Sequence, residues 1–162
     1  MKRNRERDLT GVELCRDLQK GGDKVRPEIR SVPNQVDVNF VLRKVLIVDE
    51  DVVDLAQHAS HFEARGFEVH KCTSYETALR SIEREDFDLA LVDQGSPSFE
   101  GRLVVKHLIR YNPRTPFIVL ARPKDVACSL QALLLGAVDY LEKPVSTAEM
   151  NRVIQANLGT RS

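Results

Sequence analysis

Residues 87–101 read FDLALVDQGSPSFEG. The apolar run 89–92 has the length and composition of a strand that is buried on both faces. It ends at a single carboxylate, Asp93, and residues 95–98 after it are of the types that favour turns. A buried strand that leads to a carboxylate and a polar loop is typical of a functional site at the end of a sheet.

Apolar runs of strand length recur along the chain, at 44–48, 67–71, 88–92, 116–120 and 138–142. Segments with a helical period separate these runs and follow the last one. Strands that are apolar throughout need cover on both faces, which a parallel sheet with helices on either side provides. The sequence therefore predicts an α/β fold, a doubly wound five-stranded parallel sheet with five helices.

The helical segments carry apolar residues at spacings of three and four, and we expect these residues to face the core. Asp51, directly before the first segment, is placed as its N-cap. The expected core residues are Val52, Leu55, Ala56, Ala59, Phe62, Ala78, Leu79, Ile82, Leu103, Val104, Leu108, Ile109, Val126, Leu130, Leu133, Leu134, Met150, Val153 and Ile154.

The chain divides into three parts. Residues 1–43 form an N-terminal extension, in which Thr10 and Glu13 fit the capping box of one short helix before a linker. Two roles stay open for this extension, a mobile tail or a helix that docks on a partner or on the domain. Residues 44–158 form the five-stranded domain, and residues 159–162 form a tail.

The composition argues against several classes of protein. Lysine plus arginine and aspartate plus glutamate are balanced at 24 each, so no overall charge attracts nucleic acid or a membrane surface. No stretch approaches the ~18 apolar residues of a membrane span. The scattered Cys15, Cys72 and Cys128 indicate reduced thiols in a cytoplasmic protein. We expect solvated side chains, without the spacing of metal ligands, for the four histidines, His58, His61, His70 and His107.

Charged side chains follow three of the predicted strands. Asp49 and Glu50 follow the first, Asp93 the third and Lys143 the fifth. The carboxyl ends of parallel strands meet at one edge of the sheet, so we expect these side chains to lie close together. Crowded carboxylates need a cation, and hard oxygen ligands without His or Cys favour Mg²⁺. A magnesium site beside a lysine suits phosphoryl transfer, which depends mainly on positioning and charge neutralisation.

Asp93 is the carboxylate that we expect to accept the phosphoryl group. A carboxylate can act as a nucleophile and form an acyl phosphate, and the polar loop after Asp93 leaves room for the incoming group. Backbone N–H groups of residues 95–98 are placed to bind its oxygens.

Three segments give the sequence a family resemblance. VLIVDED, FDLALVDQGSPSFEG with its D-x-x-x-P-x-x-E-G pattern, and GAVDYLEKP occur in this order and spacing. Residues 43 to about 158 thereby resemble the receiver domain of two-component response regulators, which implies a flavodoxin-like receiver fold. ARGFEV and GAVDYLEKP are also similar to the receivers of redox-responsive global regulators in bacteria. Those regulators carry a helix-turn-helix that does not follow here, so we expect a stand-alone receiver.

The resemblance also implies roles for individual residues. Asp93 is the implied phosphoacceptor, and Lys143 pairs with the phosphoryl group after a cis bond to Pro144. Mg²⁺ is the implied cofactor, and its implied ligands are Asp49 (through water), Glu50, Asp93 and the backbone carbonyl of Gly95.

The implied partners are proteins. A histidine kinase or histidine phosphotransfer protein supplies the phosphoryl group. A downstream protein binds the face formed by the fourth helix, the fifth strand and the fifth helix, around the switch residue Tyr140, and homodimerisation stays open. The only chemistry expected is Mg²⁺-dependent self-phosphorylation and dephosphorylation of Asp93, rather than turnover of a separate substrate.

The switch position 121 and the loop after Asp93 depart from the family's pattern. Ala121 stands at a switch position where receivers usually carry Thr or Ser, so a hydrogen bond to the phosphoryl group worth ~1.5–3 kcal/mol is missing. Coupling to Tyr140 is therefore expected to weaken, and Arg122 is a candidate replacement donor. Gln94 stands where an aliphatic residue is usual, and Gly95 is expected to leave the acyl phosphate open to water.

A pseudo-receiver is one alternative function. Such a domain keeps the fold as a protein-binding module that is not regulated by phosphorylation. Ala121 and the altered loop favour this alternative, whereas the intact acidic residues and lysine argue against it.

A phosphatase is the second alternative. Residues 48–53, VDEDVV, fit the DxDx[TV] motif of haloacid-dehalogenase-like phosphatases, with Asp49 as nucleophile and Asp51 as general acid. That family needs a further acidic pair after a later strand, and none follows the fourth or fifth strand here.

Overall fold

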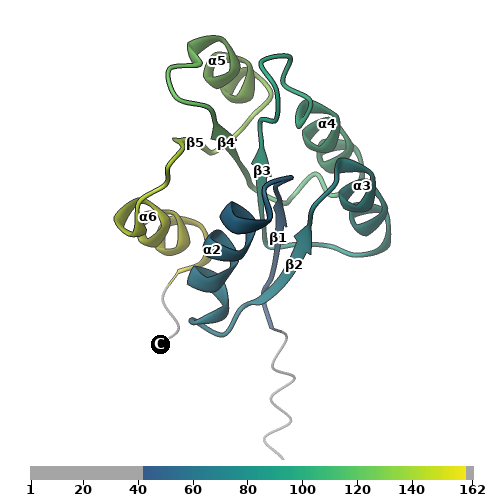
Figure 1. Cartoon of the computed structure of the whole chain (residues 1–162). Helices are drawn as coiled ribbons and strands as arrows, with labels where there is room; N and C mark the ends of the chain where they lie inside the picture. The colour runs from purple at the N-terminus through teal and green to yellow at the C-terminus, as the bar shows by residue number, and fades with distance from the viewer. Residues whose placement is uncertain (1–41, 160–162) are drawn as a thin grey trace, which may run out of the picture. The chain divides into compact units, whose positions relative to one another are not determined.

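The computed structural model describes residues 42–159. Five strands form one parallel sheet in the order β2-β1-β3-β4-β5 (Figure 1), which confirms the predicted α/β fold. The strands are β1 (Lys44–Val48), β2 (Glu68–Cys72), β3 (Leu89–Asp93), β4 (Phe117–Ala121) and β5 (Asp139–Glu142). The helices are α2 (Val52–Glu63), α3 (Tyr75–Arg84), α4 (Arg102–Tyr111), α5 (Val126–Leu134) and α6 (Thr147–Leu158). The predicted N-terminal helix and its linker lie outside the described residues.

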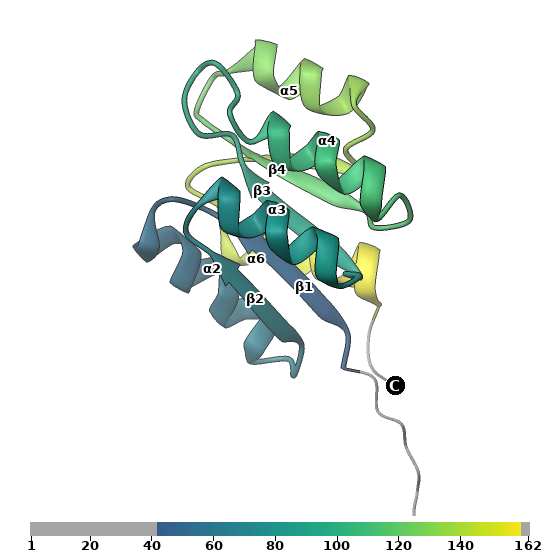
Figure 2. The ribbon, with the colours of Figure 1, turned by 90° about the vertical axis from the view of Figure 1, so that its right-hand side faces the viewer.

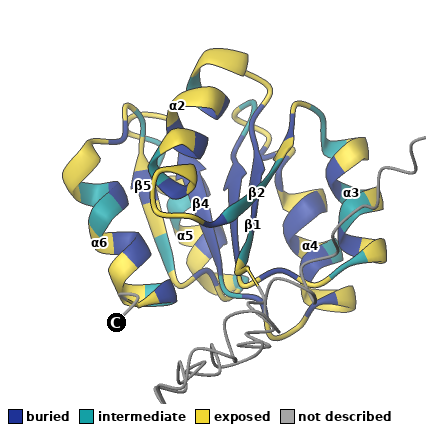
Figure 3. Cartoon of the chain, turned by 90° about the horizontal axis from the view of Figure 1, so that it is seen from below, coloured by how far each residue is buried: buried dark blue, intermediate teal, exposed yellow. Residues whose placement is uncertain are grey.

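The sheet separates two hydrophobic layers. Helices α2 and α6 cover one face, and α3, α4 and α5 cover the other (Figure 2). Successive strand residues point to opposite faces, so Leu46 packs in the layer of α3 to α5 and Ile47 packs in the layer of α2 and α6. The middle of the sheet is buried on both sides (Figure 3), as apolar parallel strands require.

Side chains cap several of the helices that follow the strands. Asp51 accepts hydrogen bonds from the amides of Val53 and Asp54, so the predicted N-cap of α2 is confirmed. Asp125 caps α5, and Ser146 caps α6. These short connections hold the helices close to the carboxyl edge of the sheet. Among residues 42–159, no helix is long and apolar enough to cross a membrane.

The predicted core face of α5 is wrong. Val126 and Leu134 are 76% and 79% exposed, and the helix buries the smaller Cys128 and Ala132 against the sheet. Small residues at the contact turn the large apolar side chains of this helix outward. Exposed side chains also replace expected core positions at Val52, Ala56, Leu103, Ile109, Leu130 and Leu133.

Candidate functional site

Lys143 joins the charged strand ends at the carboxyl edge of the sheet. Its Nζ atom lies 2.7 Å from Oδ2 of Asp49, 2.8 Å from Oδ1 of Asp93 and 3.1 Å from Oδ2 of Asp54. The peptide bond between Lys143 and Pro144 is cis, as expected. Lys143 therefore contacts two of the other predicted site residues, Asp49 and Asp93.

Asp54 is a member of this group that the sequence reasoning missed. It lies in the first turn of α2, three residues after the N-cap Asp51. The first turn of a helix that follows a strand lies next to the end of that strand. An acidic residue in this turn could therefore have been predicted as a member of the site. The rotation of α2 about its axis, which brings this side chain to Lys143, depends on packing against the sheet.

Burial sets the electrostatics of the two central groups. Asp49 is 1% exposed, and burial raises its pKa above the ordinary value even though Lys143 acts in the opposite direction. Burial alone lowers the pKa of Lys143, but its hydrogen bonds to Asp49 and Asp93 outweigh burial and hold that pKa above its ordinary value. Lys143 therefore remains a cation that faces the carboxylates.

His58 lies beneath Asp49, and the expectation of a solvated histidine is wrong here. The side chain is buried, and its Nδ1 atom lies 4.0 Å from Oδ2 of Asp49 with no hydrogen-bond partner among the described residues. Burial, followed by the charge of Lys143, lowers the pKa of His58. The lowered pKa favours the neutral form of this ring, which lies next to Asp49 inside the domain.

The loop after Asp93 turns back toward its own carboxylate. Gly95 has a φ of 78°, and its amide donates a hydrogen bond of 2.8 Å to Oδ2 of Asp93. A Cβ atom on Gly95 would lie 2.2 Å from the hydroxyl oxygen of Tyr75. The loop is therefore less open than the sequence suggested, because Tyr75 occupies the space that a side chain of residue 95 would take.

Glu50 is exposed and stands apart from the contacts of Lys143. Within residues 42–159, the one group of potential metal-ligand side chains whose atoms lie within 4.8 Å of one another is Glu68, His70 and Glu85. Both ring nitrogens of His70 already contact carboxylates, at 2.8 and 3.0 Å, and Lys44 contacts Glu85 at 2.6 Å. The side chains of that group already contact one another and Lys44, and these contacts correct the expectation that His70 is simply solvated.

The two expected switch positions lie at different depths. Ala121 ends β4 and is buried, whereas Tyr140 on β5 is 39% exposed. The side chain of Arg122 is exposed, and its backbone amide donates to Oε1 of Gln94 at 2.8 Å. The observed hydrogen bond from residue 122 is therefore donated by its backbone amide, and its acceptor is the side chain of Gln94.

A family model described as "Response regulator receiver domain" matches residues 45–155. The chain belongs to this family. The match begins one residue into β1 and includes the other four strands, so the carboxyl edge with Asp49, Asp93 and Lys143 lies within the receiver domain. The phosphatase alternative has no support from this match.

Two curated relatives resemble the receiver domain. The chain is 30% identical over 121 residues to regulatory protein AtoC of Escherichia coli K12, and this alignment covers 75% of the chain and 26% of AtoC. The chain is 36% identical over 108 residues to response regulator SaeR of Staphylococcus aureus, and this alignment covers 65% of the chain and 46% of SaeR. The chain thus spans less than half the length of these relatives.

Two crystal structures resemble it as well. A CheY-like receiver domain from Methanospirillum hungatei JF-1 has 30% identity and a TM-score of 0.66, covering 72% of this chain and 94% of that one. A response regulator from Burkholderia pseudomallei, with a phosphorylated aspartic acid, a calcium ion and citrate, has 25% identity and a TM-score of 0.63. That alignment covers 71% of this chain and 66% of that one.

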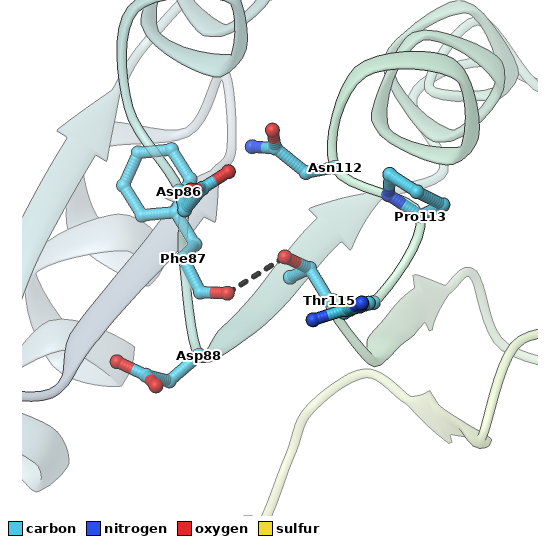
Figure 4. A pocket seen from close by; sticks show the side chains of 7 residues that line it. Asp86, Phe87, Asp88, Asn112, Pro113 and Thr115 are labelled. Atoms are coloured by element: carbon cyan, nitrogen blue, oxygen red, sulfur yellow. Dashed lines mark hydrogen bonds between the residues drawn. The ribbon is translucent and has the colours of Figure 1, made fainter.

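The opposite edge of the sheet holds a separate hollow of about 450 Å³. It lies where the chain enters β3 and β4, and the hydroxyl of Thr115 donates to the carbonyl of Phe87 at 2.6 Å across it (Figure 4). The lining residues are Asp86, Phe87, Asp88, Asn112, Pro113, Arg114 and Thr115. This hollow lies at the end of the strands away from Asp93.

Proposed function

We propose that the receiver domain accepts a phosphoryl group on Asp93 from a histidine kinase or a histidine phosphotransfer protein. The observation that carries the proposal is the setting of the Asp93 carboxylate. Its Oδ1 atom contacts Lys143 at 2.8 Å, and its Oδ2 atom accepts a hydrogen bond from the Gly95 amide. A carboxylate fixed beside a lysine and a backbone donor is suited to nucleophilic attack on phosphorus.

The transfer replaces one bond to phosphorus by another. An oxygen of Asp93 bonds to the phosphorus atom while the P–N bond of the donor phosphohistidine breaks, and the imidazole leaves with the electron pair. Lys143 pairs with the charge on the transferred oxygens, and the amides of the loop 95–98 hold them. Ala121 contributes no hydroxyl to this group.

Mg²⁺ is the cofactor that the donor set fits. The proposed ligands are all hard oxygen atoms, which is the chemistry that Mg²⁺ prefers, and they are Asp49 (through water), Glu50, Asp93 and the carbonyl of Gly95. When bound, Mg²⁺ neutralises charge on the phosphoryl group during transfer. The Burkholderia relative contains a phosphorylated aspartic acid and a calcium ion, and this favours binding of a divalent cation by the present receiver as well.

We assign the output to the face formed by α5, β5 and α6. α5 exposes large apolar side chains, and Tyr140 is partly exposed on the adjacent β5. Exposed apolar side chains gathered on one face are typical of a protein-binding surface. The proposed binding partner of this face is a downstream protein with a complementary apolar surface. If a second copy of the domain binds there instead, measurements of self-association in solution will show it.

Beryllofluoride, a mimic of the phosphoryl group, tests the acceptor directly. With Mg²⁺ present, we expect resolved ¹⁹F signals of the bound ion for the wild type and for Asp88→Asn, whose carboxylate lies at the opposite edge of the sheet. Asp93→Asn is expected to give none. If the wild type gives none either, the domain is a binding module that is not phosphorylated.

A further inference from the structure

The side chain of Gln94 connects the two loops that border Asp93. Gln94 is fully buried and directly follows the carboxylate. Its Oε1 atom accepts a hydrogen bond of 2.8 Å from the amide of Arg122. Its Nε2 atom donates to Oδ2 of Asp125 and, at 3.4 Å, to the carbonyl of Ser96. One amide group therefore joins the loop after β3 to the loop after β4.

Asp125 continues this connection into α5. Its second oxygen, Oδ1, accepts a hydrogen bond of 2.9 Å from the amide of Cys128 and so caps the helix. The amide of Cys128, and then Gln94, hold the pKa of Asp125 below its ordinary value. The ionised carboxylate thus bonds Gln94 with one oxygen and the first turn of α5 with the other.

The hydrogen bonds of Gln94 are costly to break, whereas the packing of α5 against the sheet leaves this helix free to shift. A buried side-chain amide that loses its hydrogen-bond partners destabilises the fold by about 1–3 kcal/mol. Gln94 therefore keeps its hydrogen bonds when its backbone moves. The backbone of Gln94 is tied to β4 and α4 through Leu120 and Gly101, at 2.8 and 3.1 Å. By contrast, α5 buries only Cys128 and Ala132, so it has little apolar contact that resists a shift.

We propose that Gln94 is a positioning residue that couples Asp93 to α5 through Asp125, in place of the hydroxyl that Ala121 lacks. This inference rests on the proposed phosphorylation of Asp93. A group attached to Asp93 replaces its bond to the Gly95 amide and shifts the start of the loop. Gln94 transmits that shift to Asp125, and the first turn of α5, with the apolar output face, moves with it.

Three single variants separate this role from simple stability. Gln94→Met keeps the length of the side chain but removes both polar groups. Asp125→Ser keeps an oxygen that caps α5 but is too short to meet Gln94. The control is Thr115→Val, which removes a buried hydrogen bond of 2.6 Å between the entries to the same two strands at the opposite edge (Figure 4).

Amide NMR spectra with Mg²⁺, before and after beryllofluoride is added, give two readouts for each protein. Shifts at Gly95 and Ser96 report binding, and shifts at residues 126–134 report the response of α5. We expect both sets in the wild type and in Thr115→Val. In Gln94→Met and Asp125→Ser, we expect the binding shifts to remain and the α5 shifts to be lost, with no further loss in the double variant.

Two outcomes would overturn the coupling role while the acceptor proposal stands. One is an α5 response in Gln94→Met equal to that of the wild type, and the other is a wild type whose shifts end at the Gly95 loop. A wild type without shifts at Gly95 would overturn the acceptor proposal and the coupling together. Hydrogen exchange supplies an independent check. The Arg122 amide should exchange at least ~10-fold faster in Gln94→Met, because the substitution removes its hydrogen-bond acceptor. An unchanged exchange rate would contradict the hydrogen bond between Arg122 and Gln94.

Discussion

Gly101 shows how tightly the backbone surrounds Asp93. A Cβ atom at position 101 would lie 2.1 Å from the carbonyl oxygen of Asp93. The φ of Gly101 is −55°, which every residue adopts, so the close contact and not the backbone conformation requires glycine. The final Gly of the D-x-x-x-P-x-x-E-G pattern therefore sets how closely α4 approaches the acceptor strand.

Replacing Gly101 with alanine should destabilise the domain. The added methyl group collides with backbone, which cannot rotate away as a side chain does, so we expect a loss of about 1–3 kcal/mol in the free energy of unfolding. Urea denaturation followed by circular dichroism measures this loss. A midpoint equal to that of the wild type would show that the contact is relieved without cost.

Residue identity and spacing were sufficient to predict the group of Asp49, Asp93 and Lys143, because parallel strands bring their carboxyl ends to one edge. Tyr75 and His58 were beyond this reasoning. Each lies on a helix, and which side of a helix faces the site depends on how that helix packs. The two hydrogen bonds between Gln94 and the β4–α5 loop could not be predicted either, because they depend on the path of two loops.

Helix α6 depends on a capping box at its start. The amide of Glu149 donates to Oγ of Ser146 at 3.2 Å, and Oε2 of Glu149 accepts from the amide of Ser146 at 2.9 Å. These two bonds pair backbone donors that the first turn of a helix otherwise leaves open. The hydrogen bonds from Ser146 hold the pKa of Glu149 below its ordinary value of 4.5.

Replacing Glu149 with alanine should weaken the domain in a pH-dependent way. Because the pKa is lower in the folded state, the ionised side chain adds stability above about pH 4.5 that is lost as the pH falls through the folded pKa. We expect a difference of about 0.5–1 kcal/mol at neutral pH, which shrinks in acid. Thermal unfolding of both proteins across this pH range checks it, and a difference that grows in acid would contradict the assignment.

At the level of whole elements, periodicity predicted the order and number of strands and helices but not the buried face of α5. Strand bounds differ from the prediction by one residue at most, since the runs of strand-forming residues mark where the strands lie. For α5, the apolar spacing of Val126, Leu130 and Leu134 is that of a core face. The helix instead buries its small residues, which shows that period alone does not select the side that meets the sheet.

The whole domain has an acidic carboxyl edge, a hollow at the opposite edge, and an apolar outer surface on α5. The family match spans residues 45–155, and the two sites and the surface lie within this span. Residues 1–41 lie outside the described part of the chain, so the two roles that the sequence left open for the extension both remain hypotheses.

The double variant Leu130→Glu with Leu134→Glu tests the outer surface. Both side chains are exposed, so we expect a change in stability within about 0.5 kcal/mol per site and loss of partner binding or self-association. Analytical ultracentrifugation in the presence of Mg²⁺ and beryllofluoride measures self-association, and Leu103→Glu on α4, also exposed, is the matched control. Equal losses in the control would mean that charge in general, and not this face, is responsible.

The central claim is that Asp93 accepts a phosphoryl group, and the intact mass of the protein after incubation with phosphoramidate and Mg²⁺ tests it most directly. We predict one added phosphoryl group on the wild type and on Asp88→Asn, removed by hydroxylamine as an acyl phosphate should be, and none on Asp93→Asn. An unchanged mass for the wild type, or the same added mass on Asp93→Asn, would contradict the account.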